Sequence, residues 1–307
     1  MRIKELDFLK GVMIILVITF HLVYFEHLYP YAKQVVYTFH MPVFLVISGY
    51  LMNVNKNWKD FLLSVAGLAI PYIIMESGYI VMASLLPINE HIDQLTIGIL
   101  FSKLLLHPLG PYWYLHSLIL CGITYYIIFR YYQAERLNQF IMSGLFFYLY
   151  SHVLGILPFA SSIFFLAGIV LRQCHVGFMQ CFQSSAIAVT AFALLICHEQ
   201  YLSPSTLGGV LIVYLVISSC LFVFKYLHRN ITRLIIYLGR NSLPLYVFSP
   251  VFTILCKPMI PYLMFDKTGM LFLTASLVIC ISGCLCIGYL MDVLRITPLF
   301  FRKQWIN

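Results

Sequence analysis

Long apolar runs are the feature of this 307-residue sequence that most limits its possible folds. About ten of them recur along the chain, and most approach the roughly 20 residues that an α-helix needs to cross a hydrocarbon layer about 30 Å thick. In all, 62% of the residues are apolar and only 10% are charged, whereas soluble domains carry about 25% charged residues. The sequence does not show the alternating segments of a membrane β-barrel. We therefore predict an all-α, polytopic membrane helix bundle with about ten transmembrane helices.

The predicted spans occupy most of the chain. They cover residues 8–26, 35–53, 61–86, 112–131, 138–153, 156–172, 184–199, 206–227, 235–256 and 270–291. The loops between them are short, so we expect residues 1–307 to form a single membrane domain. The apolar segment 95–107 is too short to cross a membrane, and we expect it to be an interfacial or re-entrant part of a loop.

Lysine and arginine are distributed unevenly between the predicted loops. With the N-terminus in the cytoplasm, fifteen of the nineteen basic residues lie at cytoplasmic ends of spans and four lie in outer loops. The fifteen are Arg2, Lys4, Lys10, Lys56, Lys59, Arg130, Arg136, Arg172, Lys225, Arg229, Arg233, Arg240, Arg295, Arg302 and Lys303; the four are Lys33, Lys103, Lys257 and Lys267. This bias predicts an even number of spans with both termini in the cytoplasm. The net charge of +8 therefore indicates topology and not a nucleic-acid partner.

The cysteines and most of the histidines do not indicate a metal site. Nine cysteines lie mostly inside apolar runs and form no CxxC pair, so we interpret them as small apolar core residues. The histidines without the spacing of metal ligands are His91, His107, His116, His152, His175, His198 and His228. We expect no metal cofactor.

The first apolar run carries three polar side chains that would be costly in contact with lipid. A charged residue near the centre of a membrane helix costs about 2.5–3.5 kcal/mol on insertion scales. On one continuous helix, Lys10 and His21 would lie within about 20° of the same face and about 16 Å apart, with Asp7 about 40° away. We therefore expect these three side chains to face protein or a water-filled cavity.

A second imidazole is predicted at the same depth. His40 lies near the outer end of the second span, about as deep as His21 at the end of the first. Pro42 removes a backbone donor shortly after it, which suits a helix that lines a cavity. The sequence thus predicts an outer polar layer that contains two imidazoles.

An inner polar layer is predicted at the cytoplasmic ends of the helices. Arg240, Asn241 and Ser242 stand at the cytoplasmic start of the ninth span, at the depth of Asp7 and Lys10. This layer combines cations with amide and hydroxyl groups. A phosphate-bearing ligand would suit it.

Taken in order, these motifs resemble those of the membrane-bound acyltransferase family 3. The motifs are Leu6-Asp7-x-x-Lys10-Gly11 with His21, Phe39-His40-Met41-Pro42, Pro71-Tyr72, Trp113-Tyr114-Leu115 and Gly239-Arg240-Asn241-Ser242-Leu243. The resemblance covers about residues 5 to 300, and it implies a bacterial inner-membrane enzyme that uses cytoplasmic acyl-CoA to O-acylate a carbohydrate. Two positions depart from the family pattern. Lys10 stands where many relatives have the bidentate Arg, and Ser249 stands where many have His.

The resemblance also implies roles for individual residues. We expect His21, Asp7 and Lys10 to form the catalytic set, with His21 as the general base and acetyl-CoA or another acyl-CoA as the donor. We expect the substrates to contact His40, Glu76, Trp113, Arg240, Asn241 and Ser242. The acceptor would be a cell-surface polysaccharide, a glycolipid or a precursor of one, and membrane lipid would surround the protein.

The residues alone leave other interpretations open. Lys10 could be an anchor that extends from a helix end to the interface, His40 could pack two helices together, and Glu76 could need only a neighbouring cation. The main rival to an enzyme is a multi-span transporter or flippase for a glycan intermediate or small solute, with the imidazoles in a proton relay. Matching half-chains would favour this rival, and the sequence shows no convincing pair.

Overall fold

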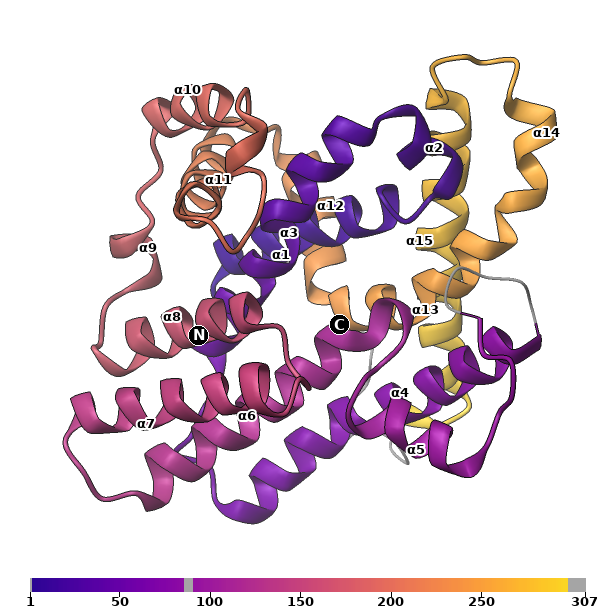
Figure 1. Ribbon diagram of the computed structural model, residues 1–307. Helices are drawn as coiled ribbons and strands as arrows, with labels where there is room; N and C mark the ends of the chain where they lie inside the picture. Colours follow the sequence, from indigo (N-terminus) through magenta and orange to yellow (C-terminus); the bar gives the residue numbers. More distant parts are fainter. Residues whose placement is uncertain (1, 86–90, 298–307) are drawn as a thin grey trace. The chain divides into compact units, whose positions relative to one another are not determined.

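The structure, a computed structural model, describes residues 2–85 and 91–297. Every regular element in these residues is a helix (Figure 1). Six helical stretches among them are long and apolar enough to cross a membrane. They run over Pro30–Leu51, Trp58–Leu85, Ile97–Tyr131, Leu207–Tyr226, Ser242–Leu263 and Met270–Val293. The prediction of an all-α membrane protein is confirmed.

The predicted count of about ten spans is not confirmed. Each predicted run contains a helix, but four of these helices have only 16, 13, 15 and 10 residues. They are α1 (Lys4–Thr19), α7 (Arg136–Tyr148), α8 (Phe159–Gln173) and α10 (Ala186–Leu195). At 1.5 Å per residue they are about 15 to 24 Å long, which is less than the thickness of the hydrocarbon layer. Apolar composition alone does not determine how many of the helices span the membrane, because it does not determine where a helix ends.

The chain forms two compact units. The first unit contains Met1–Phe44 and Val176–Thr297, and the second contains Leu45–His175. The boundary falls inside α3 (Pro30–Leu51), so one helix contributes residues to both units. The remaining short elements are α2 (Val23–Leu28), α9 (Phe178–Cys181), α14 (Ile260–Leu263), η2 (Leu149–Val153), η3 (Glu199–Tyr201) and η4 (Lys257–Met259).

Helix α1 is the centre of the first unit. It packs against α11 (Leu207–Tyr226), α12 (Arg229–Arg240), α13 (Ser242–Leu255) and α15 (Met270–Val293) (Figure 1). Apolar side chains along its whole length are fully buried, among them Leu9, Met13 and Ile18. Asp7 and Thr19 of α1 are also buried, as expected from the cost of exposing polar groups to lipid, whereas Lys4 at its start is exposed.

Two glycines allow α1 and α12 to approach each other closely. A Cβ atom on Gly239 would overlap the main-chain carbonyl of Asp7, and one on Gly11 would overlap that of Ile235. Small residues at a helix crossing permit this backbone contact, which is common between membrane helices. The crossing brings the C-terminal end of α12 against the first turns of α1.

The predicted ninth span, residues 235–256, is divided in the structure. Helix α12 ends at Arg240 and α13 begins at Ser242, with Asn241 between them at φ −101° and ψ 23°. The N–H of Asn241 is shared between the carbonyls of Leu238 at 3.1 Å and Tyr237 at 3.2 Å, a pattern common at helix ends. Because α12 carries exposed Arg229 and Arg233 on one face and buried Leu238 on another, it has the character of an interfacial helix.

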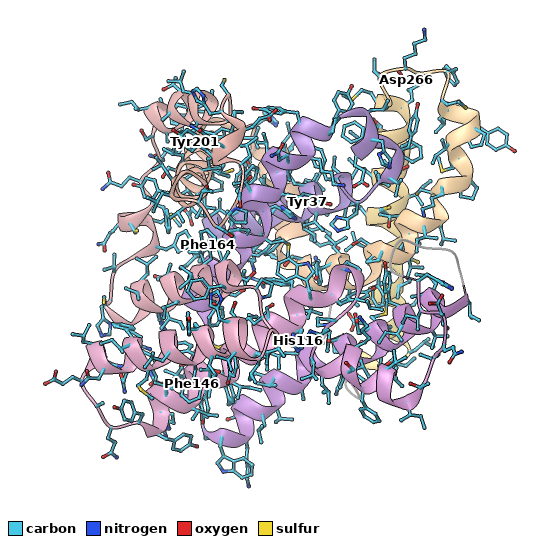
Figure 2. All side chains as sticks on the ribbon, viewed as in Figure 1. Tyr37, His116, Phe146, Phe164, Tyr201 and Asp266 are labelled. Atoms are coloured by element: carbon cyan, nitrogen blue, oxygen red, sulfur yellow. The ribbon has the colours of Figure 1, made fainter. Side chains whose placement is uncertain are left out.

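Asp266 organises the loop that precedes α15 (Figure 2). Its carboxylate accepts hydrogen bonds from the N–H of Leu271 at 2.9 Å and from the hydroxyl of Thr268 at 2.6 Å. These bonds, that from Leu271 above all, favour the charged form and hold the pKa of Asp266 below its usual value. Gly269 adopts a φ of 67° at the start of α15, a conformation that glycine reaches without strain.

Helix α6 (Trp113–Tyr131) is the centre of the second unit. It packs against α4 (Trp58–Leu85), α7 and α8 (Figure 1). The predicted re-entrant segment forms α5 (Ile97–Leu105), which has only nine residues, followed by the single turn η1 (Gly110–Tyr112). Gly110, at φ 56°, lies against the ring of Tyr79, where a side chain would not fit.

Candidate active site

A buried carboxylate in the first unit is surrounded by three cations. Asp7, whose side chain is only 3% exposed, lies 2.8 Å from Lys10 Nζ, 2.8 Å from Arg2 Nε and 3.5 Å from Arg240 Nε. We call Arg2, Asp7, Lys10 and Arg240 the basic cluster. Its three positive charges exceed its one negative charge, so the cluster keeps a surplus that a bound anion can neutralise.

The helix geometry explains how the basic cluster forms. Asp7 and Lys10 are three residues apart on α1 and therefore share one face. The contact of Gly239 with the backbone of Asp7 brings the next residue, Arg240, alongside. The side chains of Lys10, Arg240 and Arg2 are 19%, 36% and 48% exposed, so all three cations remain accessible while the carboxylate is buried.

Asn241 and Ser242 lie directly beside the basic cluster in the chain. The side-chain amide of the fully buried Asn241 donates to the carbonyl of Tyr237 at 3.0 Å, which stabilises the junction between α12 and α13. Ser242 is the half-buried first residue of α13. The structure thus places both residues next to Arg240 and gives Asn241 a role in shaping the junction.

A second cluster contains the two predicted imidazoles and one tyrosine. The ring of Tyr37 lies between those of His21 and His40, with centroid distances of 6.2 and 5.1 Å. The Tyr37 hydroxyl donates to the carbonyl of Phe20 at 3.0 Å, which fixes the ring against the turn that carries His21 (Tyr37 is labelled in Figure 2). We call His21, Tyr37 and His40 the imidazole cluster.

The hydrogen bonds of both imidazoles determine their neutral tautomers. Nδ1 of His21 lies 2.6 Å from the carbonyl oxygen of Val17, and Nδ1 of His40 lies 2.7 Å from that of Val36. A carbonyl can only accept, so Nδ1 carries the proton and Nε2 of the neutral ring keeps its lone pair. Among the described residues, no group hydrogen-bonds to Nε2 of either ring. Each Nε2 therefore keeps a lone pair, although His40 is buried with only 4% of its surface exposed.

The prediction that His21 continues the first helix is wrong. Helix α1 ends at Thr19, two residues before His21. In a continuous helix the N–H of His21 would donate to Val17, but here it donates to Ile18 at 3.2 Å, and the His21 imidazole takes the Val17 carbonyl instead. The side chain thus helps to end the helix. The calculated alignment of Lys10 and His21 on one helix face does not apply.

Helix α3 also differs from its predicted bounds. It begins at Pro30, five residues before the predicted start, and it continues as a helix through Pro42. His40 is therefore deeper along its helix than predicted, although it still meets His21 through Tyr37. Nearby, Nζ of Lys33 pairs with Oε2 of Glu26 at 3.0 Å and lies 5.3 Å from the centroid of the Tyr37 ring.

Glu76 and Trp113 belong to the second unit. Glu76 is fully buried on α4, and its Oε1 accepts a hydrogen bond from the N–H of Leu109 at 2.5 Å. Tyr72 and His116 hold the end of α5, just before this loop, by donating to the carbonyls of Leu104 and Leu105 at 2.8 and 2.9 Å. Glu76 thus has the partner that its position in an apolar run demands, and this partner is a main-chain amide.

The sequence around both clusters matches a known protein family. A family described as an acyltransferase domain matches residues 3–289, which include the imidazole cluster, Glu76 and every member of the basic cluster except Arg2. The chain belongs to this acyltransferase family. The resemblance seen in the sequence motifs is thereby confirmed.

One curated relative of this acyltransferase domain is a nodulation protein. The chain is 34% identical over 124 residues to the nodulation protein NolL of Sinorhizobium fredii (strain NBRC 101917 / NGR234). The match covers 37% of this chain and 33% of NolL, so the chain spans about a third of the length of that relative. No solved structure matches the chain.

Within the acyltransferase domain, the structure joins most of the predicted site residues. Asp7, Lys10 and Arg240 meet in the basic cluster, and His21 meets His40 in the imidazole cluster. Trp113 is half-buried at the start of α6, in the other unit from these clusters. Among the described residues, no three His, Cys, Asp or Glu side chains are placed to hold a metal ion.

Sequence reasoning missed two members of these clusters. Arg2 was interpreted only as a topology signal, because a basic residue before the first apolar run is usual. Its spacing of five residues from Asp7 was the one available sign of a contact. Tyr37 gave no sign at all, since the chain contains 22 tyrosines and the contact depends on the turn after α1.

Proposed function

We propose that this acyltransferase domain transfers an acetyl group from acetyl-CoA to a hydroxyl group of a sugar in a cell-surface polysaccharide, a glycolipid or a precursor of one. The observation that carries the proposal is the fixed tautomer of His21, whose Nε2 can accept a proton. The family match supports the reaction class. The basic cluster supports a donor that carries phosphate groups.

His21 acts as the general base in the proposed reaction. A sugar hydroxyl is a poor nucleophile at neutral pH, so Nε2 of His21 removes its proton as the oxygen attacks the thioester carbonyl. A carbon–oxygen bond forms, the carbon–sulfur bond breaks, and the proton passes from Nε2 to the CoA thiolate. Such proton transfer contributes about 10²- to 10⁴-fold to the rate. Nε2 of His40 is available to hydrogen-bond to the acceptor.

The basic cluster binds the phosphate groups of the donor. Asp7 neutralises one of three cations and fixes the positions of Lys10 and Arg240, whose exposed ends contact phosphate oxygens. Lys10 offers a point charge where Arg would offer a planar fork, so it contributes charge more than geometry. Asp7 therefore takes part by positioning and not by proton transfer.

Lys10 provides the test of this donor site. We expect Lys10→Met to raise the KM for acetyl-CoA about tenfold, because one charge-assisted hydrogen bond to phosphate is lost. Lys10→Arg keeps the charge and should retain most of the activity. The measurement is transfer from radiolabelled acetyl-CoA by the purified protein, with the exposed Lys59→Met as the matched control. A normally inserted Lys10→Met protein with a wild-type KM would show that Lys10 is only a topology anchor.

We also propose that the protein lies in the bacterial plasma membrane with both termini in the cytoplasm. The support is the distribution of basic residues, fifteen on one side of the predicted loops and four on the other. A reporter enzyme that is active only outside the cytoplasm should be inactive when fused after Asn307 and active when fused after Lys267. The opposite pattern would reverse the proposed orientation.

A further inference from the structure

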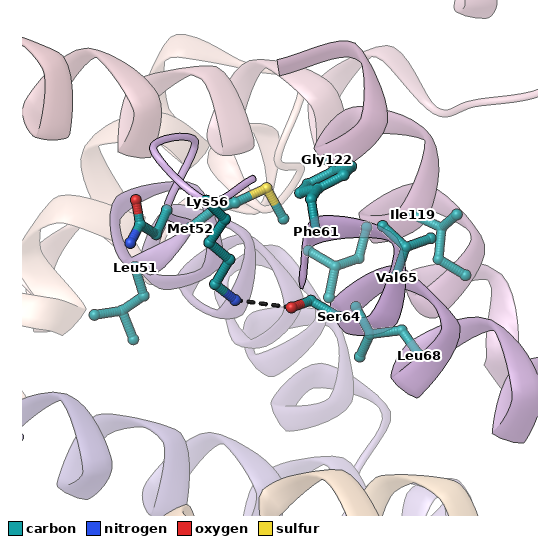
Figure 3. A pocket seen from close by; sticks show the side chains of 11 residues that line it. Leu51, Met52, Lys56, Phe61, Ser64, Val65, Leu68, Ile119 and Gly122 are labelled. Carbon is teal, nitrogen blue, oxygen red and sulfur yellow. Dashed lines mark hydrogen bonds between the residues drawn. The ribbon is translucent and has the colours of Figure 1, made fainter. Parts of the chain in front are cut away.

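A pocket in the second unit is separate in sequence from both clusters. It has a volume of about 330 Å³ and lies where the end of α3 meets the start of α4 and the middle of α6 (Figure 3). Its walls are mainly apolar, with Val65, Leu68, Leu118 and Ile119 among the lining residues. A volume of this size is at the lower end for small-molecule sites, which fits one slender ligand segment.

The rim of the pocket carries a cation with spare hydrogen-bond donors. The ammonium group of Lys56 donates to the hydroxyl of Ser64 at 2.8 Å (Figure 3). An ammonium group has three donors, and Ser64 uses one of them. The Ser64 hydroxyl is uncharged, so this bond does not neutralise the charge of Lys56. An anion at the rim would therefore find a positive charge and two remaining donors.

The position of Lys56 is fixed by the surrounding structure. Its main-chain carbonyl accepts a hydrogen bond from the Tyr126 hydroxyl at 3.0 Å. The Tyr126 ring stacks on that of Phe61, with centroids 3.7 Å apart and an angle of 8° between the rings. At the wall, a Cβ on Gly122 would lie 2.7 Å from Cε of Met52, so the glycine leaves room for the Met52 side chain. The pocket is therefore built by specific contacts.

The surroundings of the pocket indicate a ligand that comes from the membrane. Leu51 at its edge is 47% exposed, and on the neighbouring first turns of α4, Trp58 and Leu62 are 55% and 54% exposed. Lys59 lies 5.6 Å from the centroid of the Trp58 ring. Exposed tryptophan beside lysine is typical of the boundary between lipid tails and head groups. At this depth a phosphate head group reaches the rim while an acyl chain reaches the apolar wall.

We propose that this pocket binds an anionic phospholipid. The phosphate group contacts the Lys56 ammonium, and one acyl chain lies along Val65, Leu68 and Ile119. The charge of Lys56 selects an anionic lipid over a zwitterionic one, because a basic residue near the membrane surface contributes to binding anionic lipids. The site differs from the donor site in every residue, so it does not depend on the proposed acyl transfer.

Native mass spectrometry of the purified full-length protein tests this site. Delipidated protein is mixed with phosphatidylglycerol, phosphatidylcholine or inorganic phosphate, and the bound adducts are counted. We expect wild-type protein to retain phosphatidylglycerol in preference to phosphatidylcholine. Lys56→Gln should weaken phosphatidylglycerol binding about fivefold, which corresponds to about 1 kcal/mol. The nearby exposed Lys59→Gln is the charge-matched control and should bind as wild type does.

A second variant tests the apolar part of the site. Ile119→Trp fills the pocket while keeping Lys56, and it should also lower phosphatidylglycerol binding. Equal binding of phosphatidylglycerol by wild type, Lys56→Gln and Ile119→Trp would overturn the proposal. Equal effects of Lys56→Gln and Lys59→Gln would do the same, because they would reduce the site to general surface charge. Binding of inorganic phosphate at Lys56 that excludes the lipid would identify an anion site and reject a lipid site.

Discussion

Replacing His21 with alanine should lower the rate of acyl transfer at least about a hundredfold, because the reaction loses the group that removes the hydroxyl proton. His21→Gln should be nearly as slow, since an amide can hydrogen-bond to the hydroxyl but cannot take its proton. The measurement is the initial rate of transfer from labelled acetyl-CoA with purified, folded variants. His27→Ala, which removes an exposed imidazole on α2, is the matched control and should leave the rate unchanged.

The pH dependence of transfer follows from the same assignment. Only the neutral imidazole has a lone pair on Nε2, so the rate should fall as pH decreases through the titration of His21 and should be sustained above it. Added free imidazole should restore part of the activity of His21→Ala and should leave the rate of His27→Ala unchanged. A folded His21→Gln protein that transfers acetyl at close to the wild-type rate would make His21 a packing residue and would exclude the proposed mechanism.

Removing the Asp7 carboxylate should destabilise the first unit by about 3 kcal/mol. Breaking a buried ion pair costs about 3–5 kcal/mol, and the lower value applies because the three stranded cations keep some access to water. Asp7→Ala should therefore melt at a clearly lower temperature than wild type in the same detergent. Asp7→Asn keeps a hydrogen-bond acceptor for Lys10 and Arg2, so its melting temperature should lie between those of Asp7→Ala and wild type.

The exposed Asp93 supplies the control for Asp7. Its side chain is 97% exposed, so Asp93→Ala should leave the melting temperature within about 1 °C of wild type. If Asp7→Ala has the same melting temperature as wild type, the three cations do not depend on the carboxylate for their positions. Loss of transfer in such a protein would then assign Asp7 a direct part in the reaction.

The helical class and the positions of the helices could be predicted because hydropathy reports where a chain avoids water. It does not report how long an unbroken helix is. At His21 a side chain replaces the main-chain donor to Val17, and at Asn241 the backbone leaves the helical region at φ −101° and ψ 23°. Neither event changes the apolar composition of its segment. The predicted count of about ten spans is therefore not confirmed, although every predicted run contains a helix.

The candidate site was predictable where charge and depth decide the outcome. Burial of Asp7 requires compensating cations, and Lys10 and Arg240 were the basic residues at its depth, so their meeting could be expected. Glu76 shows the opposite case. Its partner is the N–H of Leu109, and every non-proline residue offers such a donor, so the sequence could not indicate which one is used.

The two ring nitrogens of His21 have separate tasks. Nδ1 donates to Val17 and ends α1, while Nε2 stands free of protein partners among the described residues. A proton arriving at Nε2 leaves the Nδ1–H bond in place and strengthens it, because the charged ring is the better donor. The turn consequently stays locked through each turnover, and the tyrosine that rests on Phe20 keeps its place with it. In the proposed mechanism, His21 can therefore cycle between protonation states without releasing the turn that its own side chain holds.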